Sequence, residues 1–209
     1  MKGLAPLNAK LLRDLWRLRA QALAIALVMA AGVGMVVMSY GMIRSLEATR
    51  EAYYARYVLA DLWAPLRRAP DSVIGELRAV PGVAGAESRV SAHATLDVAG
   101  IAEPVSARLH SLPVDLNKLV LRSGRLPRAG RADEVVASEL FVKAARLSLG
   151  DRLPALVHGK RIELRLVGTA LSPEYVYAVA PGQIFPDNRR FGVLWMAREP
   201  LSAALDMRD

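Results

Sequence analysis

The stretch Ala22–Ile43 reads ALAIALVMAAGVGMVVMSYGMI and contains no charged residue in 22 positions. As an α-helix it would be about 33 Å long, and the hydrocarbon core of a bilayer is about 30 Å thick. A buried core helix is one alternative, although such helices seldom stay uncharged over this length. A cleaved signal peptide is another, but its apolar core spans about 7–15 residues and precedes a small-residue cleavage site. Because Arg44 and Glu47 follow here, the stretch predicts an uncleaved transmembrane helix at residues 20–43.

The charges on the two sides of this helix differ, and the difference predicts its orientation. Residues 1–19 contain five basic residues and one acidic residue, a balance of +4 out of a total formal charge of +8. Residues 44–56 alternate in sign instead. The positive-inside rule therefore places the N-terminus in the cytoplasm and the residues after 43 outside. The residues that define this cytoplasmic flank are Lys10, Arg13, Trp16, Arg17 and Arg19.

Small residues follow one face of the predicted membrane helix. They recur at intervals of four residues, with one more after a further seven: Ala22, Ala26, Ala30, Gly34 and Gly41. This spacing allows two helix backbones to approach closely, which predicts packing against other membrane helices. The alternative is that alanine and glycine are simply common in membrane helices.

The segments on either side of the membrane helix also predict helices. In residues 1–19, leucines recur at roughly helical spacing with basic residues between them, which predicts an amphipathic cytoplasmic helix on the membrane surface. Contact with a cytoplasmic partner is a second role open to this segment. Residues 44–59 contain neither Gly nor Pro and are rich in helix formers, which predicts a helical stalk outside the membrane.

The remaining residues predict a mixed domain of two lobes. Residues 60–113 form the first lobe, with a strand at Leu62–Leu66, a helix at 72–80 and two strands joined near Gly100. Alternate residues from Val90 to Val98 are apolar, as expected of a half-buried strand.

Residues 114–190 form the second predicted lobe. They begin with a turn-rich, arginine-rich stretch and continue with a strand at 134–137, a helix at 138–147, strands within 151–171 and an extended segment at 174–179. Residues 191–209 predict a strand and a helix that return toward the first lobe. The predicted fold class is therefore α+β: one N-terminal transmembrane helix with a stalk, followed by a two-lobed extracytoplasmic domain.

The composition argues against several classes of protein. The chain is 53% hydrophobic and 23% charged, which is too apolar for a disordered protein. It has no cysteine, which excludes disulfides, thiolate metal sites and cysteine nucleophiles. Its three histidines lack metal-ligand spacing, and Asp133-Glu134 is expected to be a solvated turn. The scattered arginines, without interleaved aromatic residues, do not predict nucleic-acid binding. We therefore expect neither an enzyme nor a bound cofactor or metal.

The order of these segments resembles the first part of an FtsX/MacB-type ABC transporter permease. The opening LLRDLWRLRAQALAIALVMAAGVGM is similar to the first membrane helix and cytoplasmic lead of that family. The stretch from Gly150 to Met196, which contains Gly150-Asp151 and a strand pair ending in Leu166-Val167-Gly168, is similar to the later part of its extracytoplasmic domain. The resemblance covers essentially the whole chain. It departs from the family in lacking three further membrane helices, and we therefore expect a fragment of a permease.

The resemblance implies a function without chemistry in this chain. Relatives pair with a separate ATP-hydrolysing subunit, and this sequence has no G-x-x-x-x-G-K-[ST] motif for binding ATP itself. The implied role is a permease component of an export or mechanotransmission system in the bacterial inner membrane, with a periplasmic core domain. Its expected partners are the ATP-binding subunit, further permease helices or a second permease subunit, membrane lipid and a periplasmic adaptor. The alternative is a self-sufficient single-span protein that presents a periplasmic binding domain.

Overall fold

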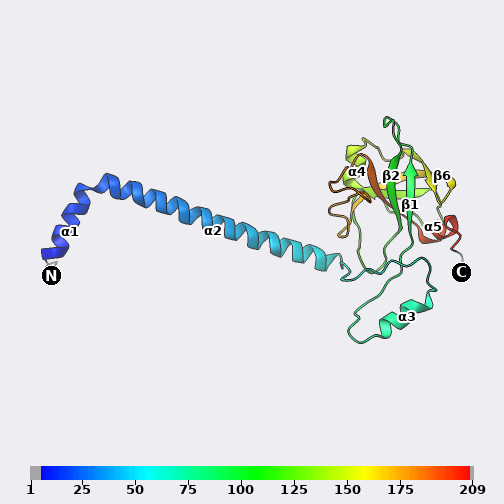
Figure 1. Ribbon diagram of the computed structural model, residues 1–209, viewed down its shortest axis with the longest axis horizontal. Helices are drawn as coiled ribbons and strands as arrows, with labels where there is room; N and C mark the ends of the chain where they lie inside the picture. The colour runs from blue at the N-terminus through cyan, green and yellow to red at the C-terminus, as the bar shows by residue number, and fades with distance from the viewer. Residues whose placement is uncertain (1–5, 208–209) are drawn as a thin grey trace. The chain divides into compact units, whose positions relative to one another are not determined.

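The computed structural model describes residues 6–207, which form two compact units divided between Ala52 and Tyr53. The first unit begins with helix α1 (Pro6–Arg17), and helix α2 (Arg19–Arg56) follows it (Figure 1). The predicted membrane helix and stalk thus belong to one helix of 38 residues. Residues 1–5 of the predicted cytoplasmic helix lie outside the described part of the chain.

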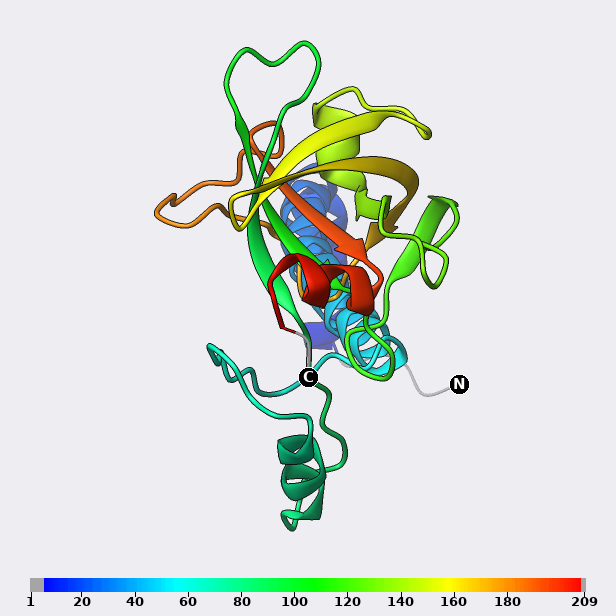
Figure 2. The same ribbon diagram turned by 90° about the vertical axis from the view of Figure 1, so that its right-hand side faces the viewer.

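The second unit is built around a seven-stranded sheet, which Figure 2 shows curling around on itself. The strands are β1 (Ser91–Leu96), β2 (Val105–Ser111), β3 (Val120–Gly124), β4 (Glu134–Ser138), β5 (Arg152–Val157), β6 (Lys160–Leu171) and β7 (Phe191–Met196). Their order in the sheet is β3-β6-β4-β7-β2-β1-β5, and β5 pairs in addition with β6. This last pairing closes six of the strands into a ring, because β6 binds β4 on one edge and β5 on the other.

The ring encloses the main hydrophobic core. Alternate residues of β1 and β5 are buried, and Leu96, Leu153 and Val157 are at most 1% exposed. The buried face of β1 begins at Ala92 and confirms the alternation predicted from the sequence. Period-two burial is what a strand produces when one face lines a core. Helices α4 (Glu139–Ala144) and α5 (Arg198–Ala204) contribute Phe141 and Leu201 to the same core.

A second apolar cluster lies on the other face of β7. All six residues of this strand are buried, because Leu194 and Met196 belong to the main core while Val193 and Trp195 belong to the second cluster. Gly192 allows the Phe141 ring to pack closely, since an added Cβ atom would lie 3.0 Å from it. The strand is therefore covered on both faces by its own chain.

The structure confirms the predicted N-terminal apolar helix and mixed α+β domain. It differs in detail from the elements that the sequence predicted. The sheet takes β1 and β2 from residues 60–113, β3 to β6 from 114–190 and β7 from 191–209, so strands of both predicted lobes pair in one sheet.

Helix α3 (Ser72–Ala79) forms as predicted, lies away from the strands (Figure 1) and buries no residue. The strand predicted at Leu62–Leu66 is wrong, since those residues have no partner strand. The extended segment predicted at 174–179 is an irregular loop.

Candidate functional site

Helix α2 carries a long exposed apolar surface. No residue of α2 is buried, and the side chains of Val28, Met38 and Met42 are 73–74% exposed. Within the described residues, α2 is the single helix whose length and apolarity suffice to cross a membrane. Apolar surface of this extent requires an apolar surrounding, which the described chain does not provide.

The small residues predicted to mediate helix packing lie along this exposed helix. Ala26, Ala30, Gly34 and Gly41 are exposed, and Ala22 is half-buried. A Cβ atom added at Gly34 or Gly41 would meet no atom within 4 Å. The structure therefore leaves room for a partner helix beside this face, and packing there remains a prediction.

The predicted flank residues lie around the junction of α1 and α2. Lys10, Arg13, Trp16 and Arg17 belong to α1 and are exposed, whereas Arg19 is the first residue of α2. The Arg19 guanidinium lies over the Trp16 ring, 5.4 Å from its centroid. At the other end of the apolar stretch, Arg44 Nε and Nη2 donate to Tyr40 Oη at 3.0 and 2.7 Å. Arginine paired with an aromatic ring at each end is typical of a membrane–water boundary.

Helix α2 ends at a strained cap. Val58 has a φ of 50°, a left-handed conformation that is costly for a β-branched residue. Its N–H donates to Ala55 O at 3.4 Å, and the N–H of Leu59 donates to Tyr54 O at 3.1 Å. These two bonds form the Schellman arrangement, in which glycine usually occupies the left-handed position. A helix end with a strained residue needs support from elsewhere in the fold.

Asn117, between β2 and β3, supplies that support. Its N–H donates to Val58 O at 2.8 Å, and its Oδ1 accepts from the N–H of Ala60 at 3.0 Å. The N–H of Lys118 donates to Tyr57 O at 2.9 Å. Asn117 is 8% exposed and itself has a φ of 52°. Three hydrogen bonds thus fix the segment after α2 to the loop that leads into β3.

A partly buried polar network fixes the start of the long loop between β6 and β7. The Arg89 guanidinium binds the Glu174 carboxylate through two hydrogen bonds, of which the Nη2–Oε1 bond is 2.6 Å long. Next to it, His110 Nδ1 lies 2.7 Å from Ser91 Oγ, and His110 Nε2 lies 2.6 Å from Tyr175 Oη. These contacts hold residues 174 and 175 against β1 and β2.

The electrostatics of His110 argue against a catalytic role. Burial, together with the positive charges of Arg89 and Arg108, lowers its pKa to about 3. A general base operates best with a pKa near the ambient pH, so this imidazole is a weak base for activating Ser91. Burial also raises the pKa of Tyr175 to about 12, so its hydroxyl remains protonated. The arrangement is suited to holding a loop rather than to moving protons.

Glu134 has a different environment from the one expected. Arg125 Nη1 and Nη2 donate to its two carboxylate oxygens at 2.6 Å each, and the N–H of Arg128 donates at 3.0 Å. The hydrogen bonds from Arg125 hold the pKa of Glu134 at about 2, although burial opposes this shift. The side chain is 4% exposed, so the expectation of a solvated turn is wrong for Glu134. Asp133, at 40% exposed, fits that expectation.

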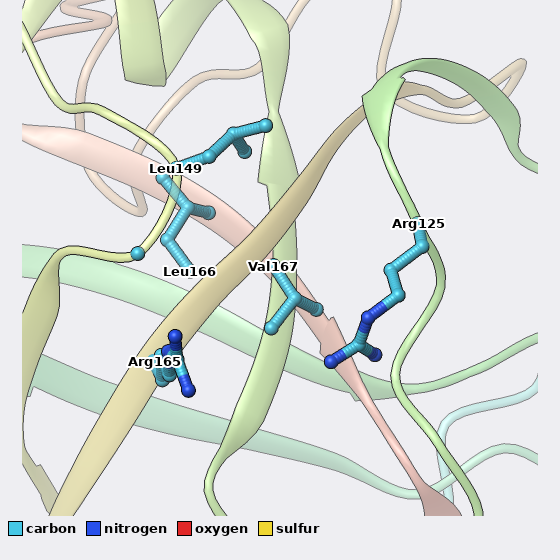
Figure 3. Close-up of a pocket in the computed structure, with 6 residues that line it drawn as sticks. Arg125, Leu149, Arg165, Leu166 and Val167 are labelled. Carbon is cyan, nitrogen blue, oxygen red and sulfur yellow. The ribbon is translucent and has the colours of Figure 1, made fainter.

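The cavities of the sheet domain are shallow. The first, shown in Figure 3, has a volume of about 250 Å³ and lies between the loop before β5 and strand β6. Arg125 and Arg165 contribute its charged groups, and Leu149, Leu166 and Val167 contribute apolar ones. Among residues 6–207, no group of three or more His, Asp or Glu side chains is placed to hold a metal ion.

The sequence pointed to the membrane helix and missed the contacts that fix its end. Asn117 is a residue type that favours turns, but nothing in its neighbourhood reveals that it binds residues 58 and 60. The pairs Arg89–Glu174 and His110–Tyr175 join residues 85 and 65 positions apart. Separations of this size leave no local pattern in a single sequence.

Comparisons with known proteins found similarity among solved structures. No family model matches the chain, and no curated protein matches it. Among solved structures, the chain is similar to the extracellular domain of the noncanonic ABC-type transporter YknZ from Gram-positive bacteria. The identity is 16%, the TM-score is 0.41, and the match covers 72% of this chain and 74% of that one.

Proposed function

We propose that the chain is a membrane-anchored permease component of an ABC-type export or mechanotransmission system in the bacterial inner membrane. Its N-terminus faces the cytoplasm, where a separate subunit binds and hydrolyses ATP. The chain itself catalyses no reaction and binds no cofactor. Its role is to pass movement from the cytoplasmic side to the extracytoplasmic domain, and the FtsX/MacB-like order of its segments supports this role.

One observation carries the proposal: α2 continues as a single helix from Arg19 to Arg56. Its first part holds the uncharged stretch, and its last turn precedes the Val58 cap that Asn117 fixes to the sheet domain. A continuous helix that is hydrogen-bonded at its end can transmit a displacement or a rotation. The small residues from Ala22 to Gly41 provide a face for the further permease helices that a complete transporter needs.

The first test is purification of the tagged chain with its genomic neighbours in a mild detergent. We expect a stoichiometric complex that contains an ATPase subunit and further membrane subunits, with ATP hydrolysis that depends on this chain. A folded, monodisperse chain that captures neither would overturn the proposal.

A helix-breaking variant tests transmission separately from assembly. Ala48→Pro lies in the exposed part of α2 beyond Arg44, where proline removes a backbone hydrogen bond and kinks the helix. We expect the complex to assemble and hydrolyse ATP while export or activation outside the membrane is lost. Ala48→Leu, which preserves the helix, is the matched control. Full output from the proline variant would exclude transmission through α2.

A single-span protein with a binding domain is the second candidate, and the loop between β6 and β7 favours it. Ile184 and Phe185 in this loop are 84% and 77% exposed, while Glu174 and Tyr175 fix its start to the sheet. Apolar side chains on a fixed loop are typical of a protein-binding surface. The same purification separates the two candidates, because this one predicts no ATPase subunit.

A further inference from the structure

Residues 61–68, with the sequence DLWAPLRR, carry an exposed apolar cluster just after α2. Leu62, Trp63 and Leu66 are 89%, 50% and 67% exposed. The sequence predicted a strand here, and the structure gives an irregular segment that pairs with no strand. Two leucines and a tryptophan therefore leave apolar surface in water, where burial would be favourable.

Two basic residues follow the apolar ones in this segment. Arg67 is exposed and makes no ion pair or side-chain hydrogen bond within residues 6–207. Arg68 donates from Nη2 to the backbone oxygen of Asp206 at 2.7 Å. The segment thus combines two leucines, a tryptophan and two cations with one acid, Asp61. Tryptophan concentrates at membrane–water interfaces, and arginine is attracted by anionic lipid headgroups.

We propose that residues 61–68 bind the outer surface of the bilayer that α2 crosses. Leu62, Trp63 and Leu66 enter the boundary between headgroups and acyl chains, and Arg67 binds the lipid phosphates. This inference rests on the membrane anchoring in the proposed function. It adds a second point of membrane contact to the one that α2 provides.

The covalent distance allows this contact. From Arg44 to Arg56, α2 rises about 20 Å beyond the apolar stretch, at about 1.5 Å per residue. Leu59 is held at the helix end by its hydrogen bond to Tyr54 O, and from there to Leu66 the chain can span at most about 24 Å when extended. The left-handed Val58 ends the helix between these points and lets the chain change direction. The segment is therefore within reach of the surface from which α2 emerges.

A lipid surface fits this cluster better than a protein partner. The segment follows directly on the helix that is apolar enough to enter the membrane, so its local concentration at a bilayer is high. Its residues form neither a helix nor a strand, so they present no regular face to a folded partner.

Spin labelling of the full chain tests the inference, and the lack of native cysteine removes any background. Leu62→Cys and Leu66→Cys are labelled in nanodiscs of phosphatidylethanolamine and phosphatidylglycerol. Collision with O₂, which partitions into lipid, is compared with collision with a water-soluble nickel chelate. Leu27→Cys, within the apolar stretch, is the lipid control. Ala102→Cys, in the exposed loop between β1 and β2, is the water control.

We expect the labels at 62 and 66 to collide more with O₂ than with nickel, as at 27, and the label at 102 to show the reverse. Labels at 62 and 66 that behave like the one at 102 would overturn the inference while leaving the membrane anchoring intact. Labels shielded from both reagents would overturn it in favour of a protein partner or a second copy. A label at 27 that reports water would overturn the anchoring itself.

Charge reversal tests the role of Arg67 without changing the apolar residues. We expect Arg67→Glu to lower the equilibrium constant for lipid contact at position 62 by about fivefold for each unit of charge in anionic nanodiscs. It should have little effect in nanodiscs of phosphatidylcholine alone. Arg161→Glu, at an exposed position on β6 with no ion pair among the described residues, is the matched control. An equal effect of both reversals would show that overall charge, rather than this segment, attracts the lipid.

Discussion

Helix α2 and strand β7 are both apolar, yet their surroundings are opposite. Every residue of β7 is buried, whereas none in α2 is. The strand is covered because the closed ring supplies one apolar cluster on its inner face and the loop after β6 supplies another outside. The helix has no such cover from the described chain. The apolar composition of a segment thus shows that it needs apolar surroundings. The topology of the fold determines whether the chain itself provides them.

The largest expected effect comes from removing a buried side chain of β7. Trp195 is 1% exposed, so Trp195→Ala should lower the free energy of unfolding of the sheet domain by about 3–5 kcal/mol. Trp63→Ala is the matched control. Trp63 is 50% exposed, so this substitution should lower the free energy of unfolding much less. Urea unfolding, monitored by hydrogen exchange of the sheet amides, measures the loss of stability in both variants. Similar losses for the two variants would contradict the contrast between buried and exposed apolar residues.

A charge in the middle of α2 should have the next largest effect. Val33 is 63% exposed and lies near the centre of the apolar stretch. Val33→Arg should disfavour membrane insertion by about 2.5–3.5 kcal/mol and leave the sheet domain folded. Flotation of membranes on a density gradient, with and without carbonate extraction, measures the inserted fraction. Thr95→Arg, at an exposed position of β1, should not change it.

Acid should destabilise the sheet domain through His110. Its folded pKa is about 3, below the unfolded value of about 6.5, so the folded state favours the neutral ring. The stabilisation is complete above pH 6.5 and decreases as the pH falls toward 3. Between pH 7.5 and pH 5 the loss should be about 2 kcal/mol. Glu134 adds a further loss only below about pH 4.5, because its folded pKa is about 2.

Unfolding experiments at several pH values check the role of His110. His110→Asn should be less stable at neutral pH but should lose most of the dependence between pH 7.5 and pH 5. His93→Gln changes an exposed histidine and should retain that dependence. Equal slopes for the two variants would assign the acid sensitivity to another group.

The smallest expected effect lies at the cap where α2 ends. Glycine tolerates the left-handed conformation of Val58, so Val58→Gly should raise the stability of the segment by about 0.5–1 kcal/mol. Val114→Gly, at an exposed loop position, should give no gain. Hydrogen exchange at Leu59 and Ala60 is the sensitive measurement. Faster exchange in Val58→Gly would mean that the valine side chain supports the cap rather than straining it.

Local patterns in the sequence predict the elements with clear periodicity. The uncharged stretch of α2 and the alternation in β1 follow directly from hydropathy, and both are confirmed. Strand β3 gives no such signal, because most of its residues are exposed and its pairing with β6 defines it. Residues 62–66 show the reverse case, in which a strand-like sequence finds no partner.

Contacts between distant residues account for the rest. The parallel pair of β2 and β7 joins Ser106 to Phe191, and the closure of the ring depends on β5 binding β6 while β1 binds β5. Prediction of the functional site from the sequence has the same limitation. The apolar helix and its flanks could be read from residue types, whereas the Asn117 contacts depend on where two loops meet in the folded chain.

The position of β7 also determines when the sheet domain can fold. In the sheet this strand lies between β4 and β2, yet it is the last of the seven strands in the sequence. During synthesis, β1 to β6 emerge first and cannot complete the ring, because the gap between β2 and β4 stays open until residues 191–196 arrive. In the proposed orientation, a chain that inserts during synthesis therefore starts to cross the membrane before the ring can close, with α2 already holding it at the surface.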